Sequence, residues 1–346
     1  MPDNPCLGDL ESRQPRASER GFLVSMKRSG RALLISGLVA ASLLTFPSAI
    51  PWMVALWLSW HTWLVVRRRP GWLPLVACAL ILLAKRPAWP PGTVVLIAMM
   101  LAVTLIRGLK RRGVFAVHWR ALTWAALIGL WAAWAVAAIE WHAAAHCTRR
   151  VAFEPARPIV CLGDSLTAGM SPSRGYPQVL QQMICVGVVN LGQDGITSAQ
   201  ALKKLPALVV ANPQAVVVEI GGHDFLKGDG RAVTKANVER IIGACRGIGA
   251  EVILMEVPRG FITDPYAGLE RELARRHDLE LVSDTSIRKL VLWSPHAPPG
   301  IWLGPGWHLS DDGLHPNARG NRVLAEEVAE SLARLFGPRM GVDRED

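Results

Sequence analysis

Residues 158–168 read Pro-Ile-Val-Cys-Leu-Gly-Asp-Ser-Leu-Thr-Ala, an apolar run that ends in a glycine, an aspartate and a serine. Apolar residues 159–162 are typical of a strand that is buried on both faces of a parallel sheet. The glycine permits a tight turn, after which Ser165 would be exposed where a helix begins. A serine after an aspartate is also an ordinary helix N-cap, so this stretch alone leaves both interpretations open.

The residues that follow alternate between short apolar runs and amphipathic runs. Continuous apolar strands separated by helices predict an α/β domain with one parallel sheet covered on both faces. In such a sheet, a functional site forms beyond the carboxyl ends of the strands. The predicted strands span residues 159–162, 186–189, 215–220, 252–256 and 279–282, and the predicted helices span residues 177–183, 198–210, 234–247, 267–277 and 318–336.

Hydropathy and charge both change abruptly near residue 150, so we expect two units in this chain of 346 residues. Residues 1–150 contain 18 Lys and Arg against 5 Asp and Glu, whereas residues 151–346 contain 20 against 23. The basic residues of the first half lie in short clusters between apolar runs. This arrangement is typical of a membrane protein, and we expect no nucleic-acid partner.

The first half contains five apolar runs without charged residues, at residues 32–46, 52–66, 72–84, 93–106 and 121–139. A bilayer core about 30 Å thick requires about 20 apolar residues in a helix, so only the last run approaches this length. Pairing of short runs into hairpins is therefore an alternative to full crossing. A cleaved signal peptide and a buried soluble helical domain are further alternatives, which the later runs and the lack of polar faces disfavour.

The distribution of Lys and Arg predicts the orientation of these runs. With a cytoplasmic N-terminus, five crossings place 14 basic residues on the cytoplasmic side and only Lys85 and Arg86 in the outer turns. The segment after residue 139 would then be extracytoplasmic. We expect a basic cytoplasmic segment (1–31), a membrane region of about five short helices (32–140), a linker (141–157), the α/β domain (158–338) and a polar tail (339–346).

A second stretch that bears on chemistry is residues 309–317, which read LSDDGLHPN. Activation of a serine hydroxyl requires a base close to it and an acceptor that orients the base. His315 would take the proton while Asp312 holds its other ring nitrogen, and Asp311 is a weaker candidate for the second task. In isolation these residues also fit a loop with a surface histidine and a helix-capping Asn317.

Two further stretches follow predicted strands and offer hydrogen-bond donors for a developing oxyanion. Residues 190–197 read NLGQDGIT, and residues 221–224 read GGHD. Glycine lets a backbone N–H approach a ligand closely, and the ring of His223 can donate one more hydrogen bond. Each stretch also fits a simple turn.

Six cysteines are scattered along the chain with no CxxC pair and no histidine at zinc-finger spacing. We therefore expect no metal site, and the spacing predicts no specific disulfide. Cys161 lies within the first apolar run and is interpreted as an inert strand residue.

Taken together, the four stretches resemble the SGNH/GDSL hydrolase family, because "LGDSLTAG", "VVNLGQDGITS", "VVVEIGGHDFL" and "DDGLHPN" occur in family order. The nearest likeness is to the thioesterase I/lysophospholipase L1-like branch. The resemblance implies the SGNH hydrolase fold, a flavodoxin-like three-layer αβα sandwich with a parallel five-stranded sheet. In this chain an α-helical membrane domain would precede it.

The resemblance also implies roles for individual residues. Ser165 would be the nucleophile, with Asp312 and His315 as its partners. The oxyanion hole would be formed by the backbone N–H groups of Ser165 and Gly195 and by the side chain of His223, with Gly192 the less suitable glycine.

One residue departs from the family pattern, which has Asn in "GGND" where this chain has His223. An imidazole donates a hydrogen bond only from the correct nitrogen, and loss of one oxyanion donor costs about two to three orders of magnitude in rate. The departure predicts altered substrate choice, weakened activity or a rearranged oxyanion hole. A role of His223 as a second general base is a further alternative.

The function that the resemblance implies is a membrane-anchored serine hydrolase that cleaves acyl esters or thioesters and needs no cofactor. An extracytoplasmic site disfavours acyl-CoA and favours lysophospholipid, lipid or acylated glycan esters. Two alternatives are a non-catalytic, membrane-tethered ligand-binding module with a degraded oxyanion hole, and an acyltransferase to a glycan. Residues 292–307, with three tryptophans, form a packed loop, an apolar rim over the acyl pocket or a contact with lipid, and a packed loop is the commonest role of such a stretch.

Overall fold

A computed structural model describes residues 33–41, 44, 46–69, 71–85, 90–111, 119–169, 175–260 and 262–337. The expected basic segment (1–31) and polar tail (339–346) lie outside these residues, as does Cys6. The chain divides into two units, Met1–Leu44 and Thr45–Asp346. In the first unit, residues 33–41 form a helix within the first predicted apolar run.

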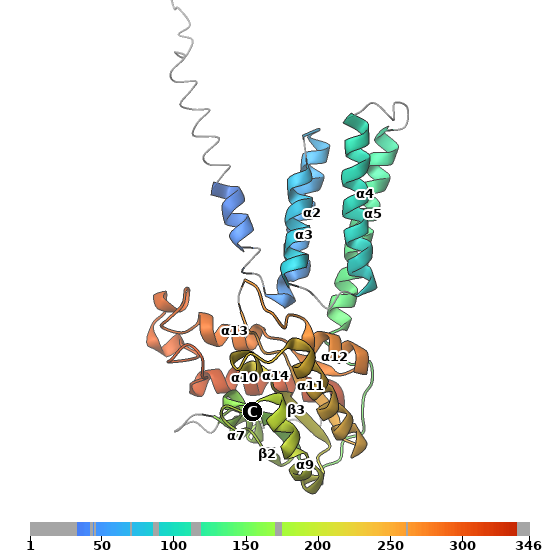
Figure 1. Ribbon diagram of the computed structural model, residues 1–346. Helices are drawn as coiled ribbons and strands as arrows, with labels where there is room; N and C mark the ends of the chain where they lie inside the picture. The colour runs from blue at the N-terminus through green and yellow to red at the C-terminus, as the bar shows by residue number, and fades with distance from the viewer. Residues whose placement is uncertain are drawn as a thin grey trace, which may run out of the picture. The chain divides into compact units, whose positions relative to one another are not determined.

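The second unit contains a sheet of five parallel strands in the order β2-β1-β3-β4-β5. Figure 1 shows β2 and β3 of this sheet with helices around them. This is a flavodoxin-like strand order, and the parallel five-stranded sheet that the resemblance implied is confirmed. The second strand begins two residues later than predicted, because Val186 packs into the core ahead of the strand. The strands are β1 (Ile159–Gly163), β2 (Val188–Asn190), β3 (Ala215–Glu219), β4 (Glu251–Met255) and β5 (Glu280–Val282).

Helices cover both faces of the sheet, which makes the predicted three layers. The predicted helix at 198–210 is broken into three pieces, because Pro206 lacks the N–H that an interior helical residue donates and instead lies near the start of a new helix. α13 was not predicted. The helices of one face are α7 (Gly175–Gln181), α13 (Thr285–Leu292) and α14 (Ala318–Phe336); those of the other are α8 (Ser198–Ala201), α9 (Leu205–Ala211), α11 (Arg231–Gly247) and α12 (Leu269–His277).

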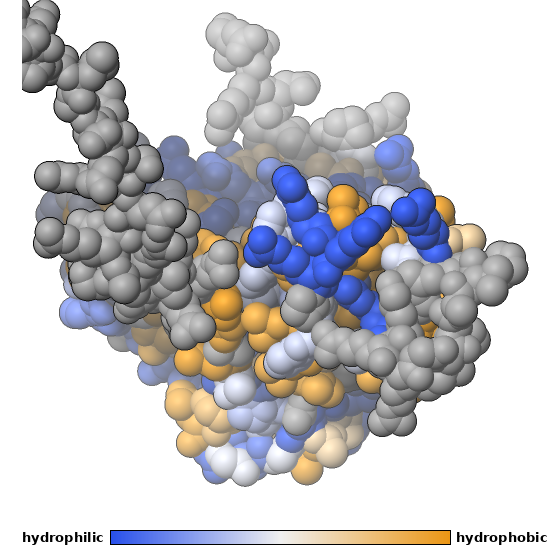
Figure 2. Space-filling view, turned by 90° about the horizontal axis from the view of Figure 1, so that it is seen from above, coloured by the Kyte–Doolittle hydropathy of each residue, from blue (hydrophilic) through white to orange (hydrophobic). Residues whose placement is uncertain are grey.

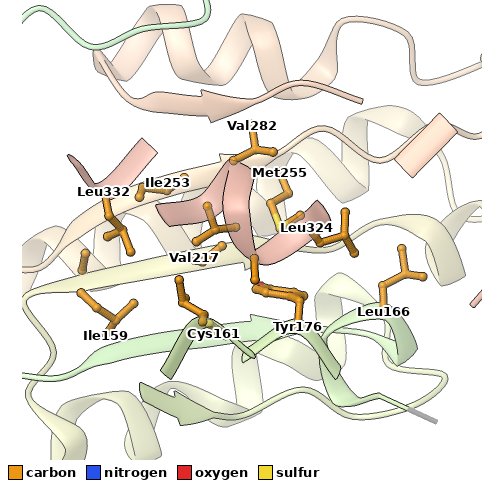
Figure 3. Close-up of a cluster of buried hydrophobic side chains, with 14 of the residues drawn as sticks. Ile159, Cys161, Leu166, Tyr176, Val217, Ile253, Met255, Val282, Leu324 and Leu332 are labelled. Carbon is orange, nitrogen blue, oxygen red and sulfur yellow. The ribbon is translucent and has the colours of Figure 1, made fainter. Parts of the chain in front are cut away.

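Alternate residues of each strand point into opposite layers. Ile159 and Cys161 of β1 pack in one apolar cluster with Leu332 of α14, as Figure 3 shows. Val160 and Leu162 pack in the cluster on the other face. Burial of an aliphatic side chain stabilises the fold by about 1.5–3 kcal/mol, so strands that are apolar on both faces fix the position of the sheet.

Between residues 46 and 143, the described residues form apolar helices that pair in sequence. α2 (Ile50–Val66) packs against α3 (Trp72–Lys85), and α4 (Pro91–Arg111) packs against α5 (Trp119–Ala143). Large apolar side chains remain exposed on all four helices. One face of the molecule, seen in Figure 2, shows hydrophobic residues beside hydrophilic ones.

Among the described residues, two stretches are long and apolar enough to cross a membrane, Pro47–Val66 and Arg120–Ala143. Trp72–Lys85 and Pro91–Arg107 are apolar but shorter. The helices thus coincide with the predicted apolar runs, while a membrane region of about five crossings stays a prediction.

The packing of α14 on the sheet generates a test of the fold. Leu332 is completely buried, and its replacement by alanine should lower the free energy of unfolding by about 2–5 kcal/mol because a cavity remains. Thermal unfolding of the full chain in detergent measures the effect. Val233→Ala, at an exposed position of α11, is the control and should change stability by less than about 0.5 kcal/mol. Equal melting temperatures for the two variants would contradict this placement of Leu332.

Candidate active site

Ser165 lies two residues beyond Gly163, the carboxyl end of β1, as the first residue of α6 (Ser165–Ala168). Asp164 caps this short helix, because its Oδ1 accepts a hydrogen bond from the Leu166 N–H at 3.1 Å. Gly163 is required before it, since a Cβ there would lie 2.0 Å from Thr167 Oγ1. The cap is therefore Asp164, and the hydroxyl of Ser165 is available for other contacts.

The structure brings Ser165, His315 and Asp312 together. His315 Nε2 lies 3.2 Å from Ser165 Oγ, and His315 Nδ1 lies 2.7 Å from Asp312 Oδ2. Asp311, the weaker candidate, has a different contact: its Oδ1 accepts a hydrogen bond from Asn317 Nδ2 at 3.0 Å. The geometry thus distinguishes between the two neighbouring aspartates.

Asp312 is held in place by several donors from its own loop. Its Oδ1 accepts hydrogen bonds from the N–H groups of Leu314 and His315 at 2.8 and 2.7 Å and from Ser310 Oγ at 3.0 Å. Partial burial acts to raise the pKa of Asp312, but the hydrogen bond from the His315 ring and those from the loop hold this pKa well below its usual range. An ionised Asp312 requires a proton on Nδ1 of His315, which leaves the lone pair of Nε2 toward Ser165.

The two glycines of the 190–197 stretch differ in their surroundings. The N–H of Gly192 donates to Asn190 Oδ1 at 2.8 Å, and a Cβ at Gly192 would lie 2.4 Å from the backbone N of Ala168. Gly195 has a φ of +71° and open space around its Cβ position, and no acceptor for its N–H occurs among the described residues. Gly192 therefore serves packing against α6, whereas Gly195 keeps a free donor.

His223 lies in α10 (Gly222–Leu226), which begins just beyond the carboxyl end of β3. Its Nε2 is buried and has no hydrogen-bond partner in the part of the chain that the structure describes. The preceding turn is fixed by the buried Arg259, which donates to the carbonyl oxygens of Ile220 and Gly221, both at 3.3 Å. His223 thus follows a turn that is fixed by Arg259, and its Nε2 is available as a hydrogen-bond donor or acceptor.

Asp224 links the two predicted oxyanion stretches, a role that sequence reasoning missed. This residue is completely buried, and its Oδ2 accepts a hydrogen bond from the Ser198 N–H at 2.8 Å while its Oδ1 accepts from Ser198 Oγ. Lys227 adds a second link by donating from Nζ to the carbonyl oxygen of Gly195 at 3.0 Å. The only signal in the sequence was an acidic residue next to the predicted donor His223.

No group of three or more His, Cys, Asp or Glu that could hold a metal ion occurs within the described ranges. Cys161 is completely buried in β1, and burial raises the pKa of its thiol to about 12. This thiol is therefore the inert strand residue that the sequence predicted.

Comparison with known proteins places this α/β domain among hydrolases. Residues 161–323 match the model of the GDSL-like Lipase/Acylhydrolase family. The chain is 31% identical over 187 residues to the "Thioesterase 1/protease 1/lysophospholipase L1" of Escherichia coli (strain K12), covering 51% of this chain and 84% of that protein. It is 34% identical over 189 residues to the "Esterase TesA" of Pseudomonas aeruginosa, covering 52% and 90%. A solved structure titled "Crystal Structure of TesA" shares 27% identity with a TM-score of 0.42, over 51% of this chain and 98% of that chain.

These matches cover about half of this chain but most of each relative. The resemblance predicted from the four sequence stretches is confirmed at the level of the family and of its thioesterase I/lysophospholipase L1-like members. The chain belongs to the GDSL-like lipase/acylhydrolase family and is an esterase-type enzyme of that family.

Proposed function

We propose that residues 158–338 form a domain that hydrolyses acyl esters or thioesters through a covalent acyl-serine intermediate. Ser165 is the nucleophile, His315 is the general base and Asp312 orients the histidine. The observation that carries this proposal is the continuous hydrogen-bonded arrangement from Asp312 Oδ2 to His315 (2.7 Å) and from His315 to Ser165 Oγ (3.2 Å). Relatives named thioesterase, arylesterase and esterase support the same class of reaction.

In the first half of the reaction, His315 Nε2 takes the hydroxyl proton as Ser165 Oγ bonds to the acyl carbon. The resulting imidazolium is stabilised by the ionised Asp312. When the tetrahedral intermediate collapses, the bond from carbon to the leaving oxygen or sulfur breaks and Nε2 returns its proton to that atom. Water then attacks the acyl-serine by the same proton transfers, which releases the carboxylic acid and restores the Ser165 hydroxyl.

The oxyanion of the tetrahedral intermediate needs donors that are already in place. We assign this role to the N–H groups of Ser165 and Gly195 and to the ring of His223. Among the described residues, each of the two backbone N–H groups lacks an acceptor and His223 Nε2 lacks a partner, which supports the assignment. Gly192 is left out because its N–H already donates to Asn190.

The buried pair of Glu219 and Asp164 supports the backbone around the nucleophile. Glu219 Oε2 accepts hydrogen bonds from the Asp164 N–H at 3.1 Å and from Thr167 Oγ1 at 3.0 Å, while Oε1 is buried with no donor in the described structure. Burial first, and then the neighbouring Asp164 carboxyl, raises the pKa of Glu219 well above its usual range. Glu219 therefore keeps its proton to higher pH than a solvent-exposed carboxyl does.

We further propose that the first half anchors the enzyme in a membrane, with the N-terminus cytoplasmic and the hydrolase domain extracytoplasmic. Two stretches long and apolar enough to cross a bilayer and the clustering of Lys and Arg between apolar runs support this. The proposed organisation is a basic segment (1–31), a membrane region (32–140), a linker (141–157), the hydrolase domain and a polar tail (339–346). Lysophospholipid, lipid or acylated glycan esters then fit the location better than acyl-CoA.

Labelling with a fluorophosphonate probe tests the nucleophile. The full chain in detergent should be labelled and should hydrolyse p-nitrophenyl esters, whereas Ser165→Ala should lose the label and about six orders of magnitude in kcat. Ser283→Ala, a partly buried serine with no assigned role, is the control and should keep both properties. Absence of labelling in the unaltered chain from pH 5 to 9 would favour a non-catalytic ligand-binding module.

Replacement of His223 tests the third oxyanion donor. His223→Ala should lower kcat by about two to three orders of magnitude with little change in KM, because the donor acts on charge that develops in the transition state. His223→Asn, which restores the amide donor of the family pattern, should recover most of kcat. A His223→Ala variant with unchanged kcat would show that the ring does not contact the oxyanion.

The raised pKa of Glu219 predicts a pH dependence of stability. Between the ordinary pKa of 4.5 and the raised value, the folded chain binds a proton that the unfolded chain has lost, so the free energy of unfolding falls as pH rises. Glu219→Gln removes this titration, and its melting temperature relative to the unaltered chain should increase from pH 5 to pH 8. Glu326→Gln, at an exposed position, should keep the original pH dependence. Parallel curves for Glu219→Gln would mean that Glu219 is ionised when folded.

A further inference from the structure

The segment between α13 and α14, which includes the proposed catalytic histidine, exposes large apolar side chains. Trp302 is 76% exposed, Trp307 59% and Ile301 51%. Leu314, the chain neighbour of His315, is 54% exposed. We call these four residues the tryptophan surface. Soluble proteins rarely expose several large apolar side chains together, so such a group indicates a partner.

The backbone of this loop is fixed by contacts at Gly300. Ile301 and Trp302 belong to a 3-10 turn that begins at Gly300, where a Cβ would lie 1.9 Å from the carbonyl oxygen of Ser294. The carbonyl oxygen of Gly300 lies 3.1 Å from Nε2 of the buried His308. The backbone is thus fixed at Gly300, while the side chains of the next two residues, Ile301 and Trp302, are exposed.

The same loop is connected to the stretch that carries Asp312 and His315. The N–H of Leu309 donates to the carbonyl oxygen of Trp293 at 2.8 Å, and Ser310 forms an antiparallel bridge with Pro316. Leu314 belongs to the tryptophan surface, and its backbone N–H also donates a hydrogen bond to Asp312 Oδ1. The loop that carries the tryptophan surface is therefore joined through its backbone to the stretch that carries Asp312 and His315.

The chemistry of this surface matches the boundary between lipid and water. Tryptophan is favoured at that boundary, because its ring is apolar while its N–H finds a polar partner. The guanidinium of Arg319 lies 5.0 Å from the centroid of the Trp307 ring, and its side chain and that of Arg322 are exposed. These cations complement the phosphate groups of anionic lipids.

We propose that the tryptophan surface docks on an anionic phospholipid bilayer and delivers lipid esters to Ser165. The inference rests on the proposed hydrolase function and narrows its substrate class to esters presented in a lipid surface. An aromatic, partly cationic surface on the segment that carries the proposed catalytic histidine fits a bilayer that holds the substrate better than a second protein, which would cover the site.

Two substrates separate docking from chemistry in the full chain reconstituted into vesicles of phosphatidylcholine and phosphatidylglycerol. The variant with both Trp302→Ser and Trp307→Ser should hydrolyse soluble p-nitrophenyl acetate within about twofold of the unaltered chain, but lysophospholipid in the vesicles at least about tenfold more slowly. The control carries Val209→Ser and Val210→Ser, which change two exposed apolar residues of α9, and should retain both rates. Arg319→Gln should lose the preference for vesicles that contain phosphatidylglycerol over phosphatidylcholine alone.

Fluorescence quenching by brominated phospholipid provides a readout that needs no turnover. The unaltered chain should lose more tryptophan emission than the double variant, because Trp302 and Trp307 contact the lipid. Docking would be overturned if the unaltered chain and the double variant were quenched equally. It would also be overturned if the double variant lost hydrolysis of both substrates to the same extent. Neither result would contradict the hydrolase function. An unaltered chain that hydrolyses neither substrate would instead refute the hydrolase function, and the quenching comparison would still decide whether this surface meets lipid.

Discussion

The hydrogen bond between His315 Nε2 and Ser165 Oγ joins residues that are 150 positions apart, and the proposed chemistry depends on it. Its two ends are fixed by different parts of the fold. Ser165 lies two residues beyond the end of β1, whereas His315 precedes α14, whose first turn is capped by Asn317 through the N–H groups of Arg319 and Gly320. Because α14 and β1 share one apolar cluster, core packing sets the distance between base and nucleophile.

The carboxyl edge of the sheet is held by buried polar groups whose partners belong to neighbouring turns. Asp224 binds Ser198, Arg259 binds the carbonyl oxygens before α10, and Glu219 binds the turn that leads to Ser165. A buried ionisable group is costly unless it is paired or neutral, so each of these contacts is kept once the chain has folded. Three loops that would otherwise move independently are thereby tied to the ends of β1 and β3.

The sequence predicted those parts of the fold that depend on local patterns. Continuous apolar runs located the strands, and two short motifs at opposite ends of the domain located Ser165 and His315. It did not predict which of Asp164 and Ser165 caps α6, because both residue types are good caps and the choice depends on backbone direction after β1. The roles of Asp224 and Glu219 were missed for a related reason, since their partners Ser198 and Thr167 come close only in the folded chain.

The proposed oxyanion hole is recognised by what the surrounding structure leaves unpaired. Buried polar groups in proteins nearly always have hydrogen-bond partners, and the completely buried Asp224 follows that rule. Within the described residues, the N–H groups of Ser165 and Gly195 have no acceptor, and Nε2 of His223 has no partner. An unpaired buried donor beside a nucleophile raises the free energy of the resting enzyme. The same donor stabilises the negative charge that develops on a substrate oxygen. The buried, unpartnered nitrogen of His223 supports its proposed place in the hole despite the departure from asparagine.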